Sequence, residues 1–257
     1  MSSRAGNLHT VLRDLQRRKA RERRGLVVAE GRRLVTDALE SGATVVSLLV
    51  ADDAADALGA VLEAAARRGV KVEHTPRRDF NELADTETPS GVLAVVEWRP
   101  LALTALRLER RATLLVLDAV QDPGNVGGMI RTAYALGAAA TVALDGTADP
   151  GGHKVLRAAM GAAFRHPVAE AHWADFAAFA ATNGVTIWAA SQGGESPVGA
   201  RPDRLALVVG NEGAGLRPEV TTAAAKRVGV PMQPGAESLN AATAAAILLY
   251  EVTRGRH

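Results

Sequence analysis

Apolar runs of strand length alternate with helix-like segments along the whole chain. Before residue 99 the runs LVVAEG, VVSLLVA, VKVEHT and GVLAVVEW are separated by helical patterns over residues 8–24, 32–41 and 53–68. Strands that alternate with helices of about 10–15 residues are typical of α/β folds. We therefore expect a small α/β domain over residues 1–98.

The alternation restarts more strongly after residue 112. The run TLLVLDAV is apolar almost throughout, as in a strand buried on both faces, and TVAL, HPVAE, VTIWAAS, LALVVG and RVGVP follow it. Helices are expected over residues 126–136, 154–162, 173–182, 218–225 and 239–253. This pattern predicts a parallel-sheet α/β domain over residues 112–257. Residues 99–111 combine proline, charge and weak periodicity, which indicates a linker.

Composition excludes several classes of protein. The chain is 47% apolar and 23% charged, as in an ordinary globular protein. It has no cysteine, so disulfides, thiolate catalysis and cysteine-ligated zinc are excluded. The lack of cysteine also fits a reducing compartment, and we expect a cytoplasmic location. We expect no metal site. No apolar run approaches the roughly 20 residues of a membrane span, and no secretory signal is visible at the start.

Positive charge is concentrated near the N-terminus. Residues 13–33 contain nine Lys and Arg against three acidic residues, although the net charge of the whole chain is only +2. Such a local excess suits the phosphates of RNA, and a solvated helix is the plainer alternative. The residues that we expect to contact RNA in this region are Arg17, Arg18, Lys19 and Arg32.

Three loops of the second half carry the candidate chemistry, because ligands of open α/β sheets bind beyond the carboxyl ends of the strands. In DAVQDPGNVGGMIR, two adjacent glycines allow close approach, and we expect Asn125 to cap the helix. GNEGAG exposes main-chain N–H and C=O groups, but its glycine spacing is not that of a dinucleotide site, which argues against an oxidoreductase. In VPMQPGAESLNAAT, Ser238 is the expected cap of the last helix.

In this order and spacing, the three segments resemble the motifs of the SpoU/TrmH family of RNA 2′-O-ribose methyltransferases. The matching stretches are NVGGMIRTAYALGA, LVVGNEGAGL and VPMQPGAESLNAATAAAI, and KVLRAAMGAAF is similar to the family's intervening helix. One departure is that Asn240 is followed by Ala241 and Ala242, where the family usually has a Val-Ser pair. Residues 8–97, including EGRRLVTDALESG, are similar to the ribosomal-protein-like substrate-binding domain of many members.

The resemblance implies a C-terminal domain with a trefoil knot, S-adenosyl-L-methionine as cofactor, and a homodimer formed through the knotted domain. It implies a cofactor pocket lined, largely through backbone groups, by Gly210, Val230 and Leu239, with Met232, Ala190, Asn211 and Gly213 beside them. The residues that match polar positions near the reaction centre are Asn125, Arg131, Glu212, Ser238 and Asn240. Arg157 is similar to a further RNA-phosphate contact.

A ribose 2′-hydroxyl is a poor nucleophile near neutral pH, so proton removal or anion stabilisation must assist its attack. The family proposal makes the residue at Arg131 the base. An arginine guanidinium stays protonated in proteins, so Arg131 fits equally well as a group that fixes an RNA phosphate and stabilises the developing alkoxide. Glu212 fits either a base or a brace that accepts backbone N–H bonds. Asn125 and Asn240 are expected to position ribose or cofactor.

The separate N-terminal domain favours 23S ribosomal RNA as the substrate over transfer RNA, because minimal transfer-RNA members often lack such a domain. Ribosomal methylation that confers antibiotic resistance is a subtype of the same reaction. A non-catalytic RNA-binding factor for ribosome assembly is the alternative from another class, and the intact Arg131 and GNEGAG loop argue against it. The modified nucleotide does not follow from the sequence.

Overall fold

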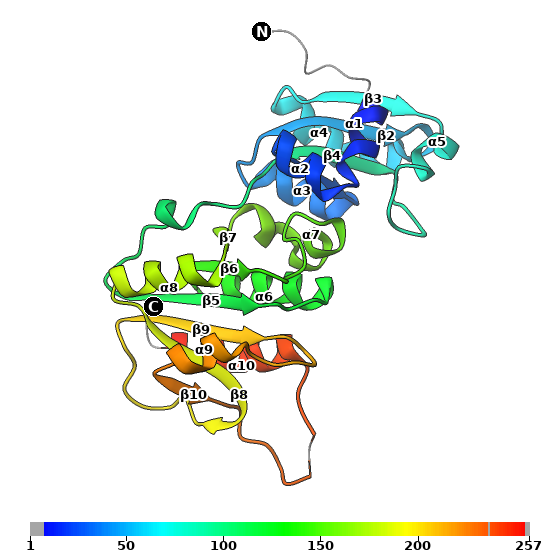
Figure 1. Cartoon of the computed structure of the whole chain (residues 1–257). Coiled ribbons are helices and arrows are strands. Elements are labelled where there is room, and N and C mark those ends of the chain that lie inside the picture. Colours follow the sequence, from blue (N-terminus) through cyan, green and yellow to red (C-terminus); the bar gives the residue numbers. More distant parts are fainter. Residues whose placement is uncertain (1–7, 236, 255–257) are drawn as a thin grey trace. The chain divides into compact units, whose positions relative to one another are not determined.

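The computed structural model describes residues 8–235 and 237–254 (Figure 1). The chain folds into two compact units. The N-terminal unit comprises the described residues up to Arg99 together with Gly151–Phe164. The C-terminal unit comprises Pro100–Pro150 and the described residues from Arg165 onward. Both units are α/β, as the sequence pattern predicted.

The N-terminal unit is built on a four-stranded mixed sheet with the order β1-β4-β2-β3. Strand β4 pairs antiparallel with both β1 and β2, and β2 pairs parallel with β3. The strands are β1 (Leu26–Glu30), β2 (Val45–Ala51), β3 (Lys71–Thr75) and β4 (Val92–Glu97). The helices are α1 (Leu8–Leu15), α2 (Arg18–Arg24), α3 (Arg32–Glu40), α4 (Gly59–Arg67), α5 (Arg77–Asn81) and α7 (His153–Ala159).

Two helices predicted in this unit are shorter than expected. The basic segment 8–24 forms two helices, because the backbone of Arg17 is extended. The side chain of Asp14 accepts hydrogen bonds from three arginines, namely Arg17, Arg23 and Arg24. The segment 53–68 begins with 3-10 turns at Asp52–Ala54 and Asp56–Leu58 and becomes α-helical only at Gly59. The helical pattern therefore overestimated the length of both helices.

Residues 151–164 belong to the N-terminal unit, although the sequence pattern placed them in the second domain. The Trp98 indole N–H donates to the Ala163 carbonyl at 2.9 Å. A Cβ at Gly151 would come within 3.0 Å of the Trp98 ring, so this contact depends on glycine. Helix α7 ends at Ala159, where Met160 adopts a positive φ of 53° and starts a 3-10 turn. This long-range packing has no signal in the sequence pattern, and the predicted domain boundaries stay a prediction.

The C-terminal unit contains a six-stranded sheet with the order β10-β8-β9-β5-β6-β7, and all five strand pairs are parallel. Its strands are β5 (Ala112–Asp118), β6 (Ala140–Leu144), β7 (Val168–Ala171), β8 (Thr186–Glu195), β9 (Arg204–Gly210) and β10 (Lys226–Val228). Its helices are α6 (Pro123–Ala135), α8 (Trp173–Thr182), α9 (Pro218–Ala223) and α10 (Ala241–Thr253). The predicted parallel sheet is confirmed.

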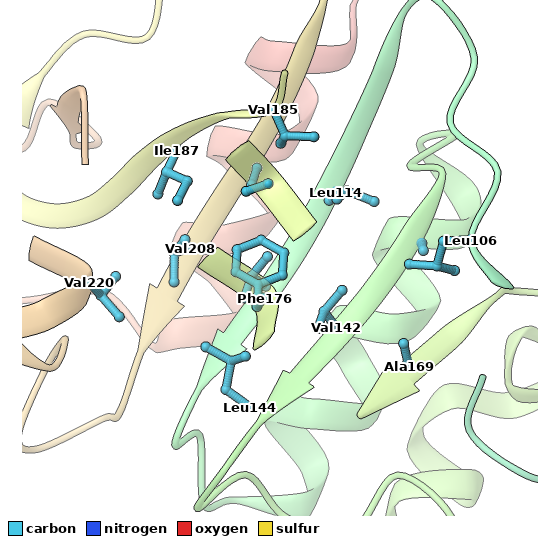
Figure 2. Packing of buried hydrophobic residues seen from close by; sticks show 14 residues of the cluster. Leu106, Leu114, Val142, Leu144, Ala169, Phe176, Val185, Ile187, Val208 and Val220 are labelled. Carbon is cyan, nitrogen blue, oxygen red and sulfur yellow. The ribbon is translucent and has the colours of Figure 1, made fainter. Parts of the chain in front are cut away.

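One face of this sheet carries a core of buried side chains around Phe176 of α8 (Figure 2). Phe176 is fully buried, which stabilises the unit by about 1.5–3 kcal/mol relative to an exposed ring. Leu106 is part of the same core, and Leu103 and Leu108 pack against it. Residues 100–111, most of the predicted linker, therefore belong to the C-terminal unit and pack on its core through Leu103, Leu106 and Leu108.

Helices α6 and α10 pack against each other, and α10 also contacts β9 and β5. A Cβ at Gly128 would lie 3.9 Å from the Ala242 side chain, so small residues allow the two helices to approach closely. The loops after β5, β9 and β10 all begin at the carboxyl edge of one parallel sheet. The trefoil knot implied by the family resemblance stays a prediction. None of the described helices combines the length and apolar character needed to cross a bilayer.

Candidate active site

The C-terminal unit holds a cavity of about 530 Å³, a volume usual for a site that binds a small molecule. The loops after β9 and β10 and the end of β8 form its walls. The residues predicted to line the cofactor pocket all lie around it: Ala190, Gly210, Asn211, Gly213, Val230, Met232 and Leu239. Glu212, Ser238 and Asn240 of the predicted reaction centre line it as well. The sequence therefore located one cavity, and the individual cofactor contacts stay predictions.

The loop after β9 is folded back on itself so tightly that only glycine fits at position 210. A Cβ at Gly210 would come within 2.5 Å of the Gly215 backbone. Asn211 and Gly215 exchange two backbone hydrogen bonds of 3.0 Å, and Gly215 has a positive φ of 72°. The Asn211 side chain accepts from the N–H groups of Gly213 and Ala214 and donates to the Ala119 carbonyl. This geometry presents backbone groups to the cavity in a fixed arrangement.

A buried ion pair joins this loop to the end of β5. The Asp118 carboxylate is fully buried and accepts from the Arg217 backbone N–H at 2.9 Å and from the Arg217 Nε at 2.5 Å. Asp118 is also the backbone neighbour of Gly210 across the β5–β9 pair. Removing Arg217 would leave the buried Asp118 charge without compensation, so the pair ties the loop geometry to the sheet. Neither side chain was a candidate residue in the sequence.

Glycines also shape the wall formed by β8 and β10. A Cβ at Gly194 would come within 2.5 Å of the Val228 backbone, and one at Gly229 within 2.6 Å of the Ser191 carbonyl. The Gly229 N–H donates to the Glu195 carbonyl at 2.9 Å. The end of β8 thus lies directly against the segment after β10, which creates a narrow and smooth wall.

Three polar side chains from the three predicted motifs form one hydrogen-bonded chain. Asn125 Nδ2 donates to Glu212 Oε1 at 2.9 Å, and Asn240 Nδ2 donates to Asn125 Oδ1 at 2.9 Å. Glu212 also accepts from the backbone N–H groups of Gln121 and Asp122 at 3.2 and 3.3 Å. The motifs are therefore connected to one another as well as close to the same cavity.

The pKa of the Glu212 carboxyl lies below its usual value. Burial alone raises that pKa, but the hydrogen bonds from the Asn125 side chain and from the backbone N–H groups of Glu212, Gln121 and Asp122 together outweigh it. The carboxylate is therefore ionised at neutral pH, and its oxygens are committed to N–H groups that position the loops. Of the two roles considered for Glu212, the contacts favour the brace over the base.

Both expected helix caps were wrong by a few residues. Asp122 caps α6 by accepting from the Asn125 N–H at 2.7 Å, and Pro123 occupies the first turn, where its missing N–H costs nothing. Asn240 caps α10 by accepting from the N–H groups of Ala242 and Thr243. Ser238 lies before the helix, at the cavity. Because Asp122 caps α6, the Asn125 side chain is left to bridge the other two motifs.

Arg131 is exposed on α6 and does not line the cavity. Within the part of the chain that the structure describes, its side chain makes no hydrogen bond or ion pair. A cation held on a helix without an internal partner is available to an external anion such as an RNA phosphate. Placement near the reacting atoms, as the family resemblance implies, stays a prediction for Arg131.

The residues predicted to bind RNA in the N-terminal unit differ in their contacts. Arg17 and Arg18 form exposed ion pairs with Asp14 and Glu22, respectively, and such pairs are worth little and easily exchanged. Lys19 and Arg32 are exposed, and their side chains have no ion pair among the described residues.

Arg157 differs from these four, because its guanidinium donates to Asp85 at 2.8 Å and lies 3.8 Å from the buried Glu30. Glu30 itself accepts from the backbone N–H groups of Asp85 and Thr86. Arg157 thus anchors α7 inside the N-terminal unit. These contacts favour an anchoring role over the predicted RNA contact.

The residues around the cavity fit an adenosyl cofactor. Backbone N–H and C=O groups of a glycine-rich loop can satisfy the edge of a heterocycle, while apolar residues such as Val230 and Leu239 cover its faces. Ser191, Gln192 and Arg227 also line the cavity and were not predicted from the sequence. They lie on β8 and β10, outside the motifs, so only the fold reveals their position.

Comparison with known proteins agrees with this geometry. Residues 112–250 match the SpoU rRNA Methylase family, and residues 11–94 match the MRM3-like substrate binding domain. A 23S rRNA (guanosine(2553)-2′-O)-methyltransferase of Bacillus subtilis is 35% identical over 93% of this chain and 92% of its own length. A 23S rRNA (adenosine(1067)-2′-O)-methyltransferase of Streptomyces laurentii is 30% identical over 76% of this chain and 74% of its own length.

Solved structures lead to the same family. An AdoMet-bound rRNA methyltransferase from Sinorhizobium meliloti is 30% identical, with a TM-score of 0.84, over 99% of this chain and 97% of that one. The AdoMet complex of the SpoU methyltransferase AviRb from Streptomyces viridochromogenes is 28% identical, with a TM-score of 0.85, over 98% of both chains. With the family match covering more than half of the chain, this protein belongs to the SpoU rRNA Methylase family.

Proposed function

We propose that this protein transfers the methyl group of S-adenosyl-L-methionine to a ribose 2′-hydroxyl of 23S ribosomal RNA. The observation that carries the proposal is the chain Glu212–Asn125–Asn240, which joins all three family motifs beside a cavity of about 530 Å³. Family membership and the two relatives that are named as 23S rRNA 2′-O-methyltransferases support the reaction and the substrate class.

The cofactor supplies an electrophilic methyl group on its sulfonium when bound. In the transfer, the ribose 2′-oxygen forms a bond to the methyl carbon while the S–CH₃ bond breaks and its electron pair stays on sulfur. The hydroxyl proton is lost to solvent. A neutral hydroxyl attacks slowly, so groups that orient it and stabilise the developing charge set the rate.

Residues of this chain divide that work. The backbone of Gly210 and its neighbours holds the cofactor, in a geometry fixed by the Asp118–Arg217 pair. Asn125 and Asn240, held by Glu212, position the ribose against the methyl group. Glu212 is not the base in this proposal, because its oxygens already accept from three N–H groups. Arg131 binds an RNA phosphate and stabilises the alkoxide.

A homodimer and a cytoplasmic location are part of the proposal. Helices α6 and α10 pack together and expose Tyr134, Ile247 and Tyr250 by 46%, 40% and 53%. Large apolar side chains exposed on adjoining helices favour an interface with a second copy of the chain. Arg131 is exposed on the same helix as Tyr134, so that interface would place it next to the partner's surface. The absence of cysteine favours a reducing compartment.

The test is methyl transfer by the purified protein to separate RNAs. Unmodified 23S ribosomal RNA and bulk transfer RNA would each be incubated with the protein and radiolabelled S-adenosylmethionine, followed by mapping of 2′-O-methyl positions. We expect label at a ribose of 23S RNA. Label confined to transfer RNA would overturn the proposal that 23S ribosomal RNA is the substrate. Cofactor binding without transfer to any RNA would favour the non-catalytic assembly factor.

A further inference from the structure

The cavity carries one charge that neither the family motifs nor the proposed reaction uses. Of the described residues that line it, only Glu212 and Arg227 are ionic. Glu212 is committed to Asn125 and to the backbone N–H groups of Gln121 and Asp122, outside the cavity. The charge left to a ligand is therefore the Arg227 guanidinium.

Arg227 lies in β10, the edge strand, where it is paired in register with Ala189 of β8. Its side chain is exposed and has no hydrogen bond or ion pair within the described residues. Ala189 and Ala190 line the same wall, so small side chains leave room beside the guanidinium. An arginine kept free at the wall of a small-molecule cavity suits a planar anion, which it binds through two parallel N–H bonds.

Lys226, the neighbouring cation, differs from Arg227 because it has partners within the protein. Lys226 precedes Arg227 in the strand, and successive side chains of a strand point to opposite faces. Its ammonium lies 5.3 Å from the centre of the Trp188 ring, 3.3 Å from a Glu195 carboxylate oxygen and 3.3 Å from the Ser196 carbonyl. Lys226 is thus satisfied within the protein on the far face, whereas Arg227 is not.

We propose that Arg227 is the residue that recognises the carboxylate of the cofactor's amino-acid end. This inference rests on the proposed function, which supplies the ligand. S-adenosylmethionine and its product S-adenosylhomocysteine each carry one anionic group, the α-carboxylate, and the cavity offers one uncommitted cation. The pairing fixes the direction of the cofactor in the cavity, with its amino-acid end toward β8 and β10.

The experiment is a two-by-two comparison of binding, with no RNA and no turnover. Isothermal titration would measure S-adenosylhomocysteine and its decarboxylated analogue against the full chain and against Arg227→Ala. The unmodified chain should prefer the carboxylate-bearing ligand by about tenfold or more, as for a charge-assisted pair. In Arg227→Ala that preference should vanish, because only the carboxylate-bearing ligand loses a partner in the variant.

Matched variants distinguish recognition of the carboxylate by Arg227 from a change in the shape of the cavity wall. Arg227→Lys should keep part of the preference, and Lys226→Ala should keep all of it. Thermal unfolding of each variant without ligand checks that the fold is intact. An unaltered preference in Arg227→Ala, or an equal loss of affinity for both ligands, would overturn the proposal. So would an unmodified chain that shows no preference between the two ligands. None of these outcomes requires methyl transfer, so failure of the inference is distinguishable from failure of the reaction.

Discussion

Asn240 donates a hydrogen bond of 2.9 Å to the side-chain oxygen of Asn125, a residue 115 positions earlier in the chain. The same Asn240 side chain accepts from the N–H groups of Ala242 and Thr243 and so starts helix α10. One amide therefore performs two tasks, a local one with its oxygen and a long-range one with its nitrogen. The two tasks can be separated by substitution.

Asn240→Asp should impair methyl transfer by about tenfold or more while keeping the helix-cap contribution of about 1 kcal/mol to stability. Aspartate is as good a helix cap as asparagine, so α10 keeps its start. The carboxylate of the variant cannot donate to Asn125 Oδ1. If the Asn125 amide turns so that its nitrogen faces that carboxylate, its oxygen then faces the Glu212 carboxylate. One oxygen–oxygen contact is therefore unfavourable in either orientation. Single-turnover methylation and urea unfolding measure the two effects. Asn240→Ala should lose the same activity and also about 1 kcal/mol of stability, and equal stability of the two variants would contradict this division.

Glu212→Gln should behave as a loss of bracing and not as a loss of a base. Hydrogen bonds hold the pKa of Glu212 below its ordinary value of 4.5, so the folded state binds fewer protons there than the unfolded state. The stability that Glu212 contributes is therefore full above pH 4.5 and is lost as the pH falls through the lowered pKa.

Urea unfolding at several pH values checks this. The unmodified protein should exceed Glu212→Gln by a constant margin between about pH 6 and 8, and the margin should shrink in acid. The pH dependence of methylation in that range should have the same shape in both proteins. A rate that loses its pH dependence only in the variant would restore Glu212 as the base.

Convergence of the three loops was predictable because parallel strands present their carboxyl ends at one edge. The caps were not predictable from local sequence. Asp122 and Asn125 are both good capping residues, and the choice depends on Glu212, some 90 positions away, which binds Asn125 instead. When a residue type suits both a helix cap and a long-range contact, only its tertiary partner decides which of the two roles it takes.

Other features have no local signal at all. Arg227 belongs to a strand of three residues, and its place at the cavity follows from its pairing with Ala189. The packing of residues 151–164 on Trp98 likewise depends on contacts more than 50 positions apart, such as the Trp98–Ala163 hydrogen bond. Periodicity reports which face of an element is buried, but not what covers that face.

Protein stability should depend on His166 in mild acid. Burial lowers the pKa of His166 from 6.5 to about 4, and its ring Nε2 lies 2.9 Å from the Thr141 hydroxyl oxygen. The unfolded chain gains a proton below pH 6.5 that the folded chain refuses, so stability falls with pH between 6.5 and 4.

At pH 5 this linkage costs about 2 kcal/mol relative to neutral pH. His166→Gln does not titrate, so its free energy of unfolding should fall by about 2 kcal/mol less between pH 7.5 and pH 5 than that of the unmodified protein. Urea titrations at the two pH values give both differences. Parallel losses in the two proteins would contradict burial of a neutral imidazole.

Arg131→Ala should lose methyl transfer by about a hundredfold or more while cofactor affinity stays within about threefold, because the side chain does not line the cavity. Single-turnover methylation and isothermal titration with S-adenosylhomocysteine measure the two quantities. Arg131→Lys keeps a positive charge but not the two-pronged donor, so it should recover part of the rate. Retained turnover in Arg131→Ala would exclude both the base and the electrostatic role.

Substitution of Ile247 tests whether α6 and α10 form a dimer interface. Ile247 and Tyr250 are 40% and 53% exposed on α10, and Tyr134 on the adjoining helix α6 is 46% exposed. Ile247→Glu would place a charge in that interface in both copies, which should weaken association by about thirtyfold or more.

Sedimentation velocity over a range of concentrations measures the effect. Val198→Glu is the matched control, because Val198 is 60% exposed but lies outside both helices. If the unmodified protein sediments as a monomer at all concentrations, the proposed dimer is wrong. If Ile247→Glu dissociates and also loses methylation while cofactor binding is kept, the reaction needs both copies, since Arg131 is exposed on α6 and does not line the cavity of its own chain.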